Sequence, residues 1–217
     1  MASTLTNKIL ILGFASILTA CASSKVDYLE PDQQKNITTE TVIPNDFNHV
    51  WDQYVASLSK SIFVINNISK DSRLINVSFS ANPPQDYINC GRTKITSKHP
   101  SRGTETFNYE VASDSNIWRG IDGTNITVEQ KIRTSLNGEA NIYIAPQNGE
   151  TTLVRTNARY LFNISVVETG LTIYRESSSN HTISFASKET GTSSDGIKCY
   201  SKGKLEQDLL EIARRLP

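Results

Sequence analysis

The stretch that decides the fold is residues 151–166, TTLVRTNARYLFNISV, which alternates between two kinds of side chain. One set is expected on a buried face, and its members are Val154, Thr156, Ala158, Tyr160, Phe162 and Ile164. The other set is expected to face water, and its members are Arg155, Asn157, Arg159 and Asn163. This period of two predicts a long strand with one buried face. Because the apolar run 140–144 and the turn dipeptide Asn148-Gly149 precede it, the sequence predicts a hairpin here.

Two other segments have the period of a helix. In the first, the apolar residues recur every three or four positions, at Phe47, Val50, Trp51, Tyr54, Val55 and Leu58. Asp46 directly precedes this helix and is a favourable N-cap. The second helix is close to the C-terminus and has its apolar stripe at Leu205, Leu209, Ile212 and Leu216. It carries Glu206 and Asp208 early and Arg214-Arg215 late, as the helix dipole favours.

Shorter strands are predicted elsewhere along the chain. The segments concerned are 37–43, 62–65, 75–79, 171–174 and 182–186. Residues 91–138 are the least regular part, and strands are indicated there only at 106–111 and 125–132. The order of strand, helix, several strands and helix predicts an α+β fold, in which two helices cover an antiparallel sheet of about five to seven strands.

The N-terminus has the features of a secretory signal peptide. One cation, Lys8, precedes the apolar stretch 9–18, which is too short to span a bilayer. The sequence then reaches Leu18-Thr19-Ala20-Cys21, which resembles the bacterial lipobox. The resemblance implies cleavage before Cys21 and lipidation of its thiol. Since Ala22 rather than an aspartate follows, it also implies attachment to the outer membrane, on the periplasmic face. The alternative is an ordinary signal peptide with an incidental cysteine at its cleavage point.

This interpretation divides the chain into three parts. Residues 1–20 are the predicted lipoprotein signal peptide, and 37–217 are a single α+β periplasmic domain. Residues 21–36 are the lipidated cysteine and a polar, aperiodic segment, predicted to be a flexible tether with a reach of roughly 20 Å. Two or more acyl chains would hold the protein stably on the membrane.

With Cys21 lipidated, Cys90 and Cys199 remain as a pair in an oxidising compartment. The sequence therefore predicts a disulfide between them. A redox or metal-binding pair is the alternative, but the two lack Cys-x-x-Cys spacing and have no histidine close by in sequence.

Residues 46–79 resemble a known family. They contain a helix with Val50-Trp51, the strand Phe63-Val64-Ile65, the turn Lys70-Asp71-Ser72 and the strand Leu74-Ile75-Asn76-Val77. In this order and spacing the segment is similar to the helix-grip domains of the third lipoprotein subunit of the outer-membrane β-barrel assembly machine. The resemblance implies a helix-grip-like fold, and no functional residue is carried over from it. That family has two such domains in tandem, whereas this chain has room for one, and the cysteine pair is not part of the family's pattern.

Composition and motifs argue against two classes of function. The chain has 22 Lys and Arg against 22 Asp and Glu, whereas a nucleic-acid-binding protein normally has a basic excess. His49, His99 and His181 are isolated in sequence, and there is no motif for a nucleophile, a bound phosphate or zinc. The sequence therefore predicts no enzyme activity, no cofactor, no metal and no nucleic-acid partner.

One charge cluster is a candidate site. Arg92, Lys94, Lys98 and Arg102 occur with no acidic residue before Glu105. The cluster is either a site for an anionic ligand, such as a lipid headgroup, or a solvated loop.

Two functions remain open at this point. The first is an accessory or scaffold subunit of an outer-membrane or cell-envelope complex, with the membrane and an envelope protein as partners. The alternative is a periplasmic binding module for a lipid or glycan. In either case residues 91–138 are where the partner or ligand is expected to act.

Overall fold

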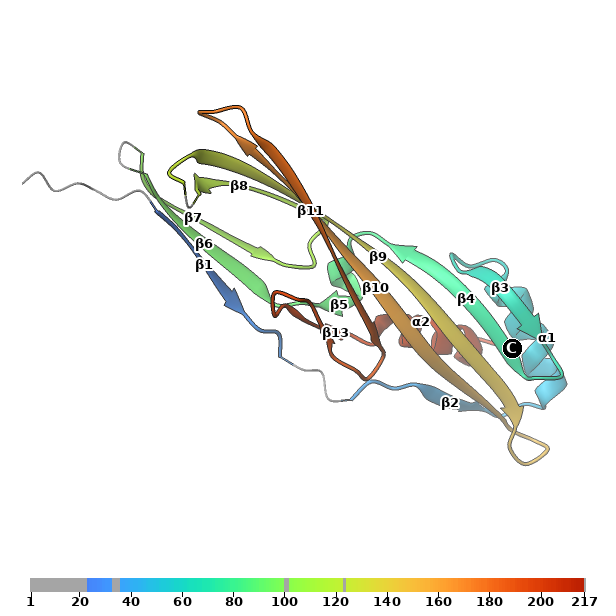
Figure 1. Ribbon diagram of the computed structural model, residues 1–217. Helices are drawn as coiled ribbons and strands as arrows, with labels where there is room; N and C mark the ends of the chain where they lie inside the picture. The colour runs from blue at the N-terminus through green and yellow to red at the C-terminus, as the bar shows by residue number, and fades with distance from the viewer. Residues whose placement is uncertain (1–22, 33–35, 100–101, 123, 217) are drawn as a thin grey trace, which may run out of the picture.

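A computed structural model of the protein describes residues 23–32, 36–99, 102–122 and 124–216. A long antiparallel sheet runs through the whole molecule (Figure 1). This main sheet has seven strands in the order β11-β10-β9-β4-β3, with β2 also paired to β10 and β8 to β9. Their bounds are β2 Glu40–Ile43, β3 Val64–Ser69, β4 Leu74–Ala81, β8 Ser115–Ile121, β9 Thr127–Pro146, β10 Thr152–Gly170 and β11 Glu176–Ala186. The predicted α+β class, mostly antiparallel sheet with two helices, is confirmed.

The hairpin of β9 and β10 confirms the prediction from residues 151–166. The two strands pair without interruption from Thr152 opposite Pro146 to Gly170 opposite Val128. The apolar side chains of the predicted inner face of β10 are buried, with Tyr160 fully so. Gly149 has a φ of 82°, which is the left-handed conformation that an Asn-Gly hairpin turn requires. Both strands extend well beyond their predicted ends.

The two predicted helices are confirmed as α1, Phe47–Leu58, and α2, Lys204–Arg214. Asp46 caps α1, since its Oδ1 accepts hydrogen bonds from the backbone N–H groups of Asn48 and His49 at 3.0 and 3.2 Å. The helices contact each other, and the Tyr54 hydroxyl of α1 donates to the carbonyl of Leu209 on α2 at 3.1 Å. They cover one part of the main sheet, where β2, β3, β4 and the adjoining ends of β9 and β10 lie, which we call the helical half (Figure 1).

A buried polar network fixes α2 to β10. The Tyr160 hydroxyl donates to the carboxylate of Glu206, 2.9 Å from Oε2, and accepts from the Ser201 hydroxyl at 3.0 Å. Glu206 is fully buried, whereas the sequence analysis gave it only a favourable interaction with the helix dipole. Burial, and then the nearby Glu206 carboxylate, raise the pKa of Tyr160. Tyr160 therefore remains a neutral donor to Glu206.

A second, three-stranded sheet lies over the rest of the main sheet. It has the order β1-β6-β7, with bounds Ser23–Leu29, Arg92–His99 and Gly103–Glu110. We call this part, together with β8 and the adjoining ends of β9, β10 and β11, the two-sheet half. The prediction that 91–138 is mostly irregular is wrong, because β6, β7 and β8 all lie there. The inward positions of β6 include Thr93 and Ser97, which are buried but polar, so the strand has no hydrophobic alternation in the sequence.

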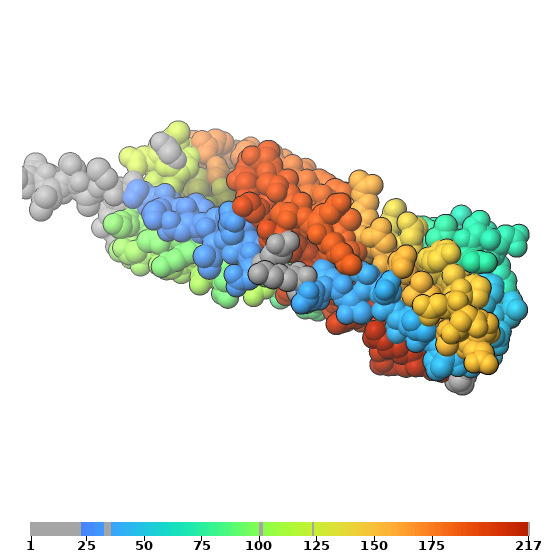
Figure 2. All heavy atoms as spheres, turned by 90° about the horizontal axis from the view of Figure 1, so that it is seen from below, coloured from blue at the N-terminus to red at the C-terminus, as the bar shows by residue number. Residues whose placement is uncertain are grey.

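Over residues 23–29 the predicted flexible tether is wrong, because Ser23–Leu29 forms β1 and pairs along its whole length with β6. Figure 2 shows the residues of this strand, in blue, as part of the molecular surface. Tyr28 secures it, since its hydroxyl accepts from the N–H of Lys198 at 2.9 Å and lies 3.2 Å from the carbonyl oxygen of Cys90. The folded domain therefore begins before residue 37. Cys21 and the signal peptide lie outside the described residues.

The disulfide between Cys90 and Cys199 is confirmed, with a sulfur–sulfur distance of 2.04 Å and both residues buried. It lies within a small third sheet of β12, β13 and β5, whose bounds are Gly191–Thr192, Lys198–Ser201 and Ile88–Asn89. The predicted strand at 171–174 is wrong, because these residues form the loop between β10 and β11.

The arrangement of layers differs from the prediction. The two helices cover the helical half only, and a sheet rather than a helix covers the two-sheet half. A helix-grip arrangement therefore stays a prediction. Among the described residues, neither helix has both the length and the apolar character needed to cross a membrane.

Candidate functional site

Three of the four predicted cations lie on one face of one strand. Arg92, Lys94 and Lys98 are exposed at alternate positions of β6, over roughly 20 Å of strand. Arg92 lies opposite Glu110 on β7, and Lys94 lies opposite Asp27 on β1. Lys98, at the end of the strand, has Ser23 and Thr104 opposite it instead. The three cations thus form a row whose positive charge is least balanced at the Lys98 end, and binding of an anionic ligand there stays a prediction.

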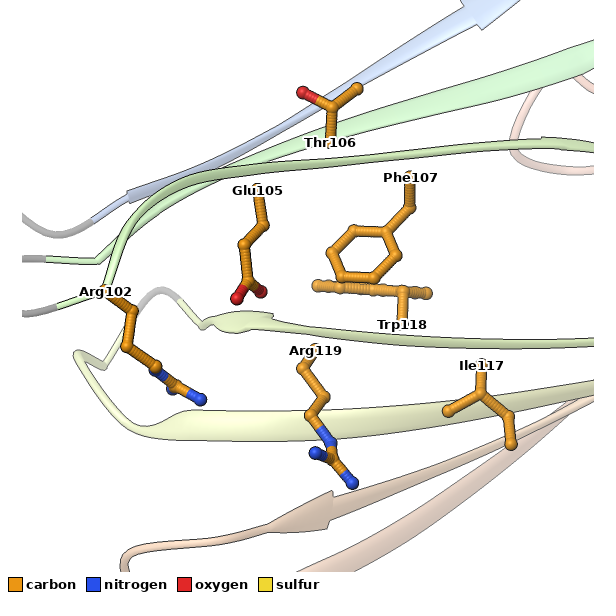
Figure 3. A pocket seen from close by; sticks show the side chains of 7 residues that line it. All are labelled: Arg102, Glu105, Thr106, Phe107, Ile117, Trp118 and Arg119. Carbon is orange, nitrogen blue, oxygen red and sulfur yellow. The ribbon is translucent and has the colours of Figure 1, made fainter.

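Arg102, the fourth cation, lies in the connection between β6 and β7 and lines a pocket. The pocket has a volume of about 540 Å³ and opens between β7 and β8. Figure 3 shows its lining residues, which are Arg102, Glu105, Thr106, Phe107, Ile117, Trp118 and Arg119. We call it the aromatic pocket, because the side chains of Phe107 from β7 and Trp118 from β8 point toward each other in it.

Hydrogen bonds hold two of these side chains in place. The indole Nε1 of Trp118 donates to Oε1 of Gln130 at 3.1 Å. The guanidinium of Arg119 donates to Oε2 of Glu129 at 2.7 Å, and this interaction lowers the pKa of the Glu129 carboxyl. These two side chains are therefore ordered before any ligand binds, which reduces the conformational entropy lost on binding.

The composition of the aromatic pocket suits an amphipathic ligand. Small-molecule sites usually combine an apolar floor with a few oriented polar groups. Here Phe107 and Trp118 supply the floor, while Arg102 can pair with a carboxylate or a phosphate through two parallel hydrogen bonds. The sequence did not reveal this pocket, because its two aromatic residues come from separate strands in a region predicted to be irregular. The alternation of Phe107 and Tyr109 within the predicted strand 106–111 was the only available signal.

A second cavity, of about 310 Å³, lies between the two sheets. Its lining is mostly aliphatic and comprises Val26, Thr93, Tyr109, Val111, Gln130, Ile132, Ile164, Val166, His181, Asp195 and Ile197. At its edge Nδ1 of His181 lies 3.3 Å from Oδ2 of Asp195. The sequence treated His181 as isolated, whereas the fold brings it to an aspartate from the segment before β13.

The described part of the chain contains no group of three or more His, Cys, Asp or Glu side chains that could hold a metal ion. The three histidines are distributed over α1, the end of β6 and β11, so the fold does not bring them together. His49 and His99 interact with other groups of the protein.

Comparisons with known proteins found no matching family model, no matching curated protein and no matching solved structure. The class of protein is therefore defined by the fold itself, an α+β domain whose long sheet is covered partly by helices and partly by a second sheet. The likenesses to the lipobox and to helix-grip domains stay predictions.

Proposed function

We propose that the protein is a membrane-anchored, non-catalytic lipoprotein of the cell envelope, and that its domain serves as an accessory or scaffold subunit of an outer-membrane or cell-envelope complex. The observation that carries the proposal is the open edge of the main sheet at β3. This strand pairs with β4, and no other strand of the described residues pairs with its second side. An unpaired edge presents a row of N–H and C=O groups to which another protein can add a strand.

The side chains around this edge also favour a partner. The exposed fractions are 70% for Ile62, 61% for Val64, 42% for Ile68 and 44% for Leu74. Proteins usually protect edge strands with charges, prolines, bulges or a covering segment, and β3 has one irregularity in its pairing, between Ile65 and Asn67. Exposed apolar side chains gathered near an unpaired edge instead mark an interaction surface.

The membrane anchor is supported by the lipobox-like sequence that ends at Cys21. Intact-mass spectrometry of protein purified from membranes tests it, beside a Cys21→Ser variant. We expect a chain that begins at Cys21 and carries acyl chains, and a variant that appears in the soluble fraction. An unlipidated, soluble mature protein would overturn this part of the proposal.

Site-specific photo-crosslinking in cells tests the partner. A photoreactive amino acid at Val64 is expected to give one crosslinked protein species, and Ile68→Lys in the same chain should abolish it. The matched control carries the photoreactive amino acid at Glu150, which is exposed in the turn between β9 and β10. If Val64 and Glu150 give the same products, or if Val64 gives none, the β3 edge is not a partner site.

A second candidate function is binding of an anionic amphipathic ligand, and the aromatic pocket favours it. Because Trp118 forms its floor, a ligand should change the tryptophan emission. We expect a short-chain phosphatidylglycerol below its critical micelle concentration to produce a saturable change, and Arg102→Gln to weaken the affinity. Lys94→Gln removes a cation of the β6 row and serves as the control. An unsaturable response, or equal losses in the two variants, would exclude this pocket as the site.

A further inference from the structure

Four chain segments meet at one end of the two-sheet half. They are the N-terminal end of β1 and the connections β6–β7, β8–β9 and β10–β11 (Figure 1). The contacts agree with this view, because Ser23 pairs with Lys98 at the end of β6. The N–H of Ile121 donates to the hydroxyl of Ser24 at 2.9 Å, and the N–H of Leu171 donates to the carbonyl of Thr127 at 2.7 Å. We call this end of the molecule the tip.

The chain length before β1 limits how far the tip can lie from an anchor at Cys21. Ser24 is three positions after Cys21, and a fully extended chain covers at most about 11 Å over three positions. Ser24 is itself bonded to Ile121 within the tip. An acylated Cys21 would therefore hold the tip close to the bilayer surface, since β1 leaves no long tether between them.

The loop 171–175 at the tip carries apolar side chains in water. The exposed fractions are 49% for Leu171, 61% for Ile173 and 89% for Tyr174. Transfer of leucine and isoleucine side chains out of water is favourable, and tyrosine favours the boundary between headgroups and acyl chains. These three side chains are the kind that a membrane interface accepts.

Ion pairs and a backbone hydrogen bond connect the same loop to its neighbours. Its Arg175 guanidinium binds the carboxylates of Asp122 at 2.6 Å and Glu168 at 2.9 Å. The N–H of Gly170 donates to the carbonyl of Arg175 at 2.7 Å and closes the loop. Lys98 and Arg102, which are exposed at the neighbouring connection, add positive charge on the side that would face anionic headgroups.

We propose that the tip rests on the bilayer, with Leu171, Ile173 and Tyr174 in the layer between headgroups and acyl chains. The inference rests on the proposed lipidation of Cys21 and adds to it an orientation of the domain. The membrane then serves as a second contact surface as well as the site of the anchor.

The test uses the full chain, purified from membranes and reconstituted into vesicles of phosphatidylethanolamine and phosphatidylglycerol. Tyr174→Cys places one free thiol in the lipidated chain, because Cys90 and Cys199 are bonded to each other and the thiol of Cys21 then carries lipid. An environment-sensitive fluorophore on that thiol reports contact with lipid. Glu150→Cys, labelled in the same way, is the matched control, since the turn between β9 and β10 lies at the opposite end of the molecule (Figure 1). A further chain combines the label at position 174 with Leu171→Ser and Ile173→Ser.

Intact mass is recorded for every preparation, so that failure of the anchor and failure of the tip contact are distinguished. With acyl chains on Cys21, we expect the label at position 174 to shift its emission to the blue and brighten several-fold, while the label at 150 does not change. The two serine substitutions should remove most of that response. Lipidated protein in which positions 174 and 150 respond alike, or in which the serine variant keeps the full response, would overturn the tip contact alone. An absence of acyl chains would overturn the anchor and the orientation together.

Discussion

Removal of the disulfide should cost a large share of the protein's stability. The bond between Cys90 and Cys199 closes a loop with a sequence separation of 109. The chain-entropy relation gives about 5 kcal/mol for a loop of this length, because the unfolded chain regains that freedom when the bond is absent. We therefore expect the free energy of unfolding of a Cys90→Ala, Cys199→Ala double variant to fall by about 5 kcal/mol.

The two tryptophans allow this loss to be measured in each half of the molecule. Trp51 is buried on α1 in the helical half, and Trp118 is buried on β8 in the two-sheet half. Urea unfolding of chains that carry Trp51→Phe or Trp118→Phe isolates the signal of the remaining tryptophan. With a slope of about 2 to 3 kcal/mol per molar urea for a domain of this size, the midpoint should fall by roughly 2 M. Each double cysteine variant is compared with its own tryptophan background.

The disulfide lies where the segment leading into β6 meets the strand leading into α2, so both tryptophan signals should shift together. The control is the protein with both cysteines, unfolded in the presence of a reducing agent that breaks the disulfide. Its urea midpoint should match that of the double variant. A loss below about 1 kcal/mol would refute the loop-entropy argument. A shift confined to Trp118 would refute the view that the bond joins the two halves into one cooperative unit.

Three further predictions concern local features. Asp46→Ala removes the cap of α1 and should lower the free energy of unfolding by about 1 kcal/mol in urea, whereas Asp46→Asn should keep most of it. Gly149→Ala forces a side chain into a backbone φ of 82° and should cost about 1 to 2 kcal/mol in the same assay, and an unchanged midpoint would contradict this. The pKa of Asp122 is lowered from 3.8 to about 2, chiefly by the N–H of Ile126 and further by Arg175. Its stabilising effect is therefore complete above pH 4 and is lost as the pH falls through about 2, and Arg175→Gln should raise this pKa in an NMR titration of the carboxyl carbon.

The sequence predicted the elements whose buried positions are apolar. Along β10, apolar Tyr160 and Phe162 alternate with polar residues, and along α1 the apolar residues recur at helical spacing, so both elements were found. A buried disulfide was equally predictable, because only two cysteines remain once Cys21 is set aside. In each case the buried side chains are apolar, so the hydrophobic pattern of the sequence identifies them.

The strands that the sequence analysis missed are held in place by interactions other than burial of apolar side chains. In β6 the inward positions include Thr93 and Ser97. The strand β1 is held by its pairing with β6 and by side-chain hydrogen bonds, among them those of Tyr28 to the segments around the disulfide. Pairing between strands and hydrogen bonds from one tyrosine leave no periodic trace in the sequence. The aromatic pocket was missed for a related reason, since Phe107 and Trp118 meet only once β7 and β8 are assembled.

If the protein is anchored at Cys21 as proposed, its attachment through β1 rather than through a tether determines where a partner must lie. Along β9, residue Val128 lies at the tip, and β4 pairs with β9 from Leu136 to Tyr143. β3 pairs only with Leu74–Ser78 of β4, and these residues lie opposite Glu139–Tyr143 of β9. At about 3.3 Å per residue, the β3 edge therefore stands roughly 35 to 50 Å from the tip. A flexible tether would let this edge take any direction, whereas a continuous sheet resting on its tip holds it at a fixed height. If the tip contacts the bilayer, the partner at β3 must therefore present its binding segment at that height above the membrane, which restricts it to proteins that extend well beyond the headgroups.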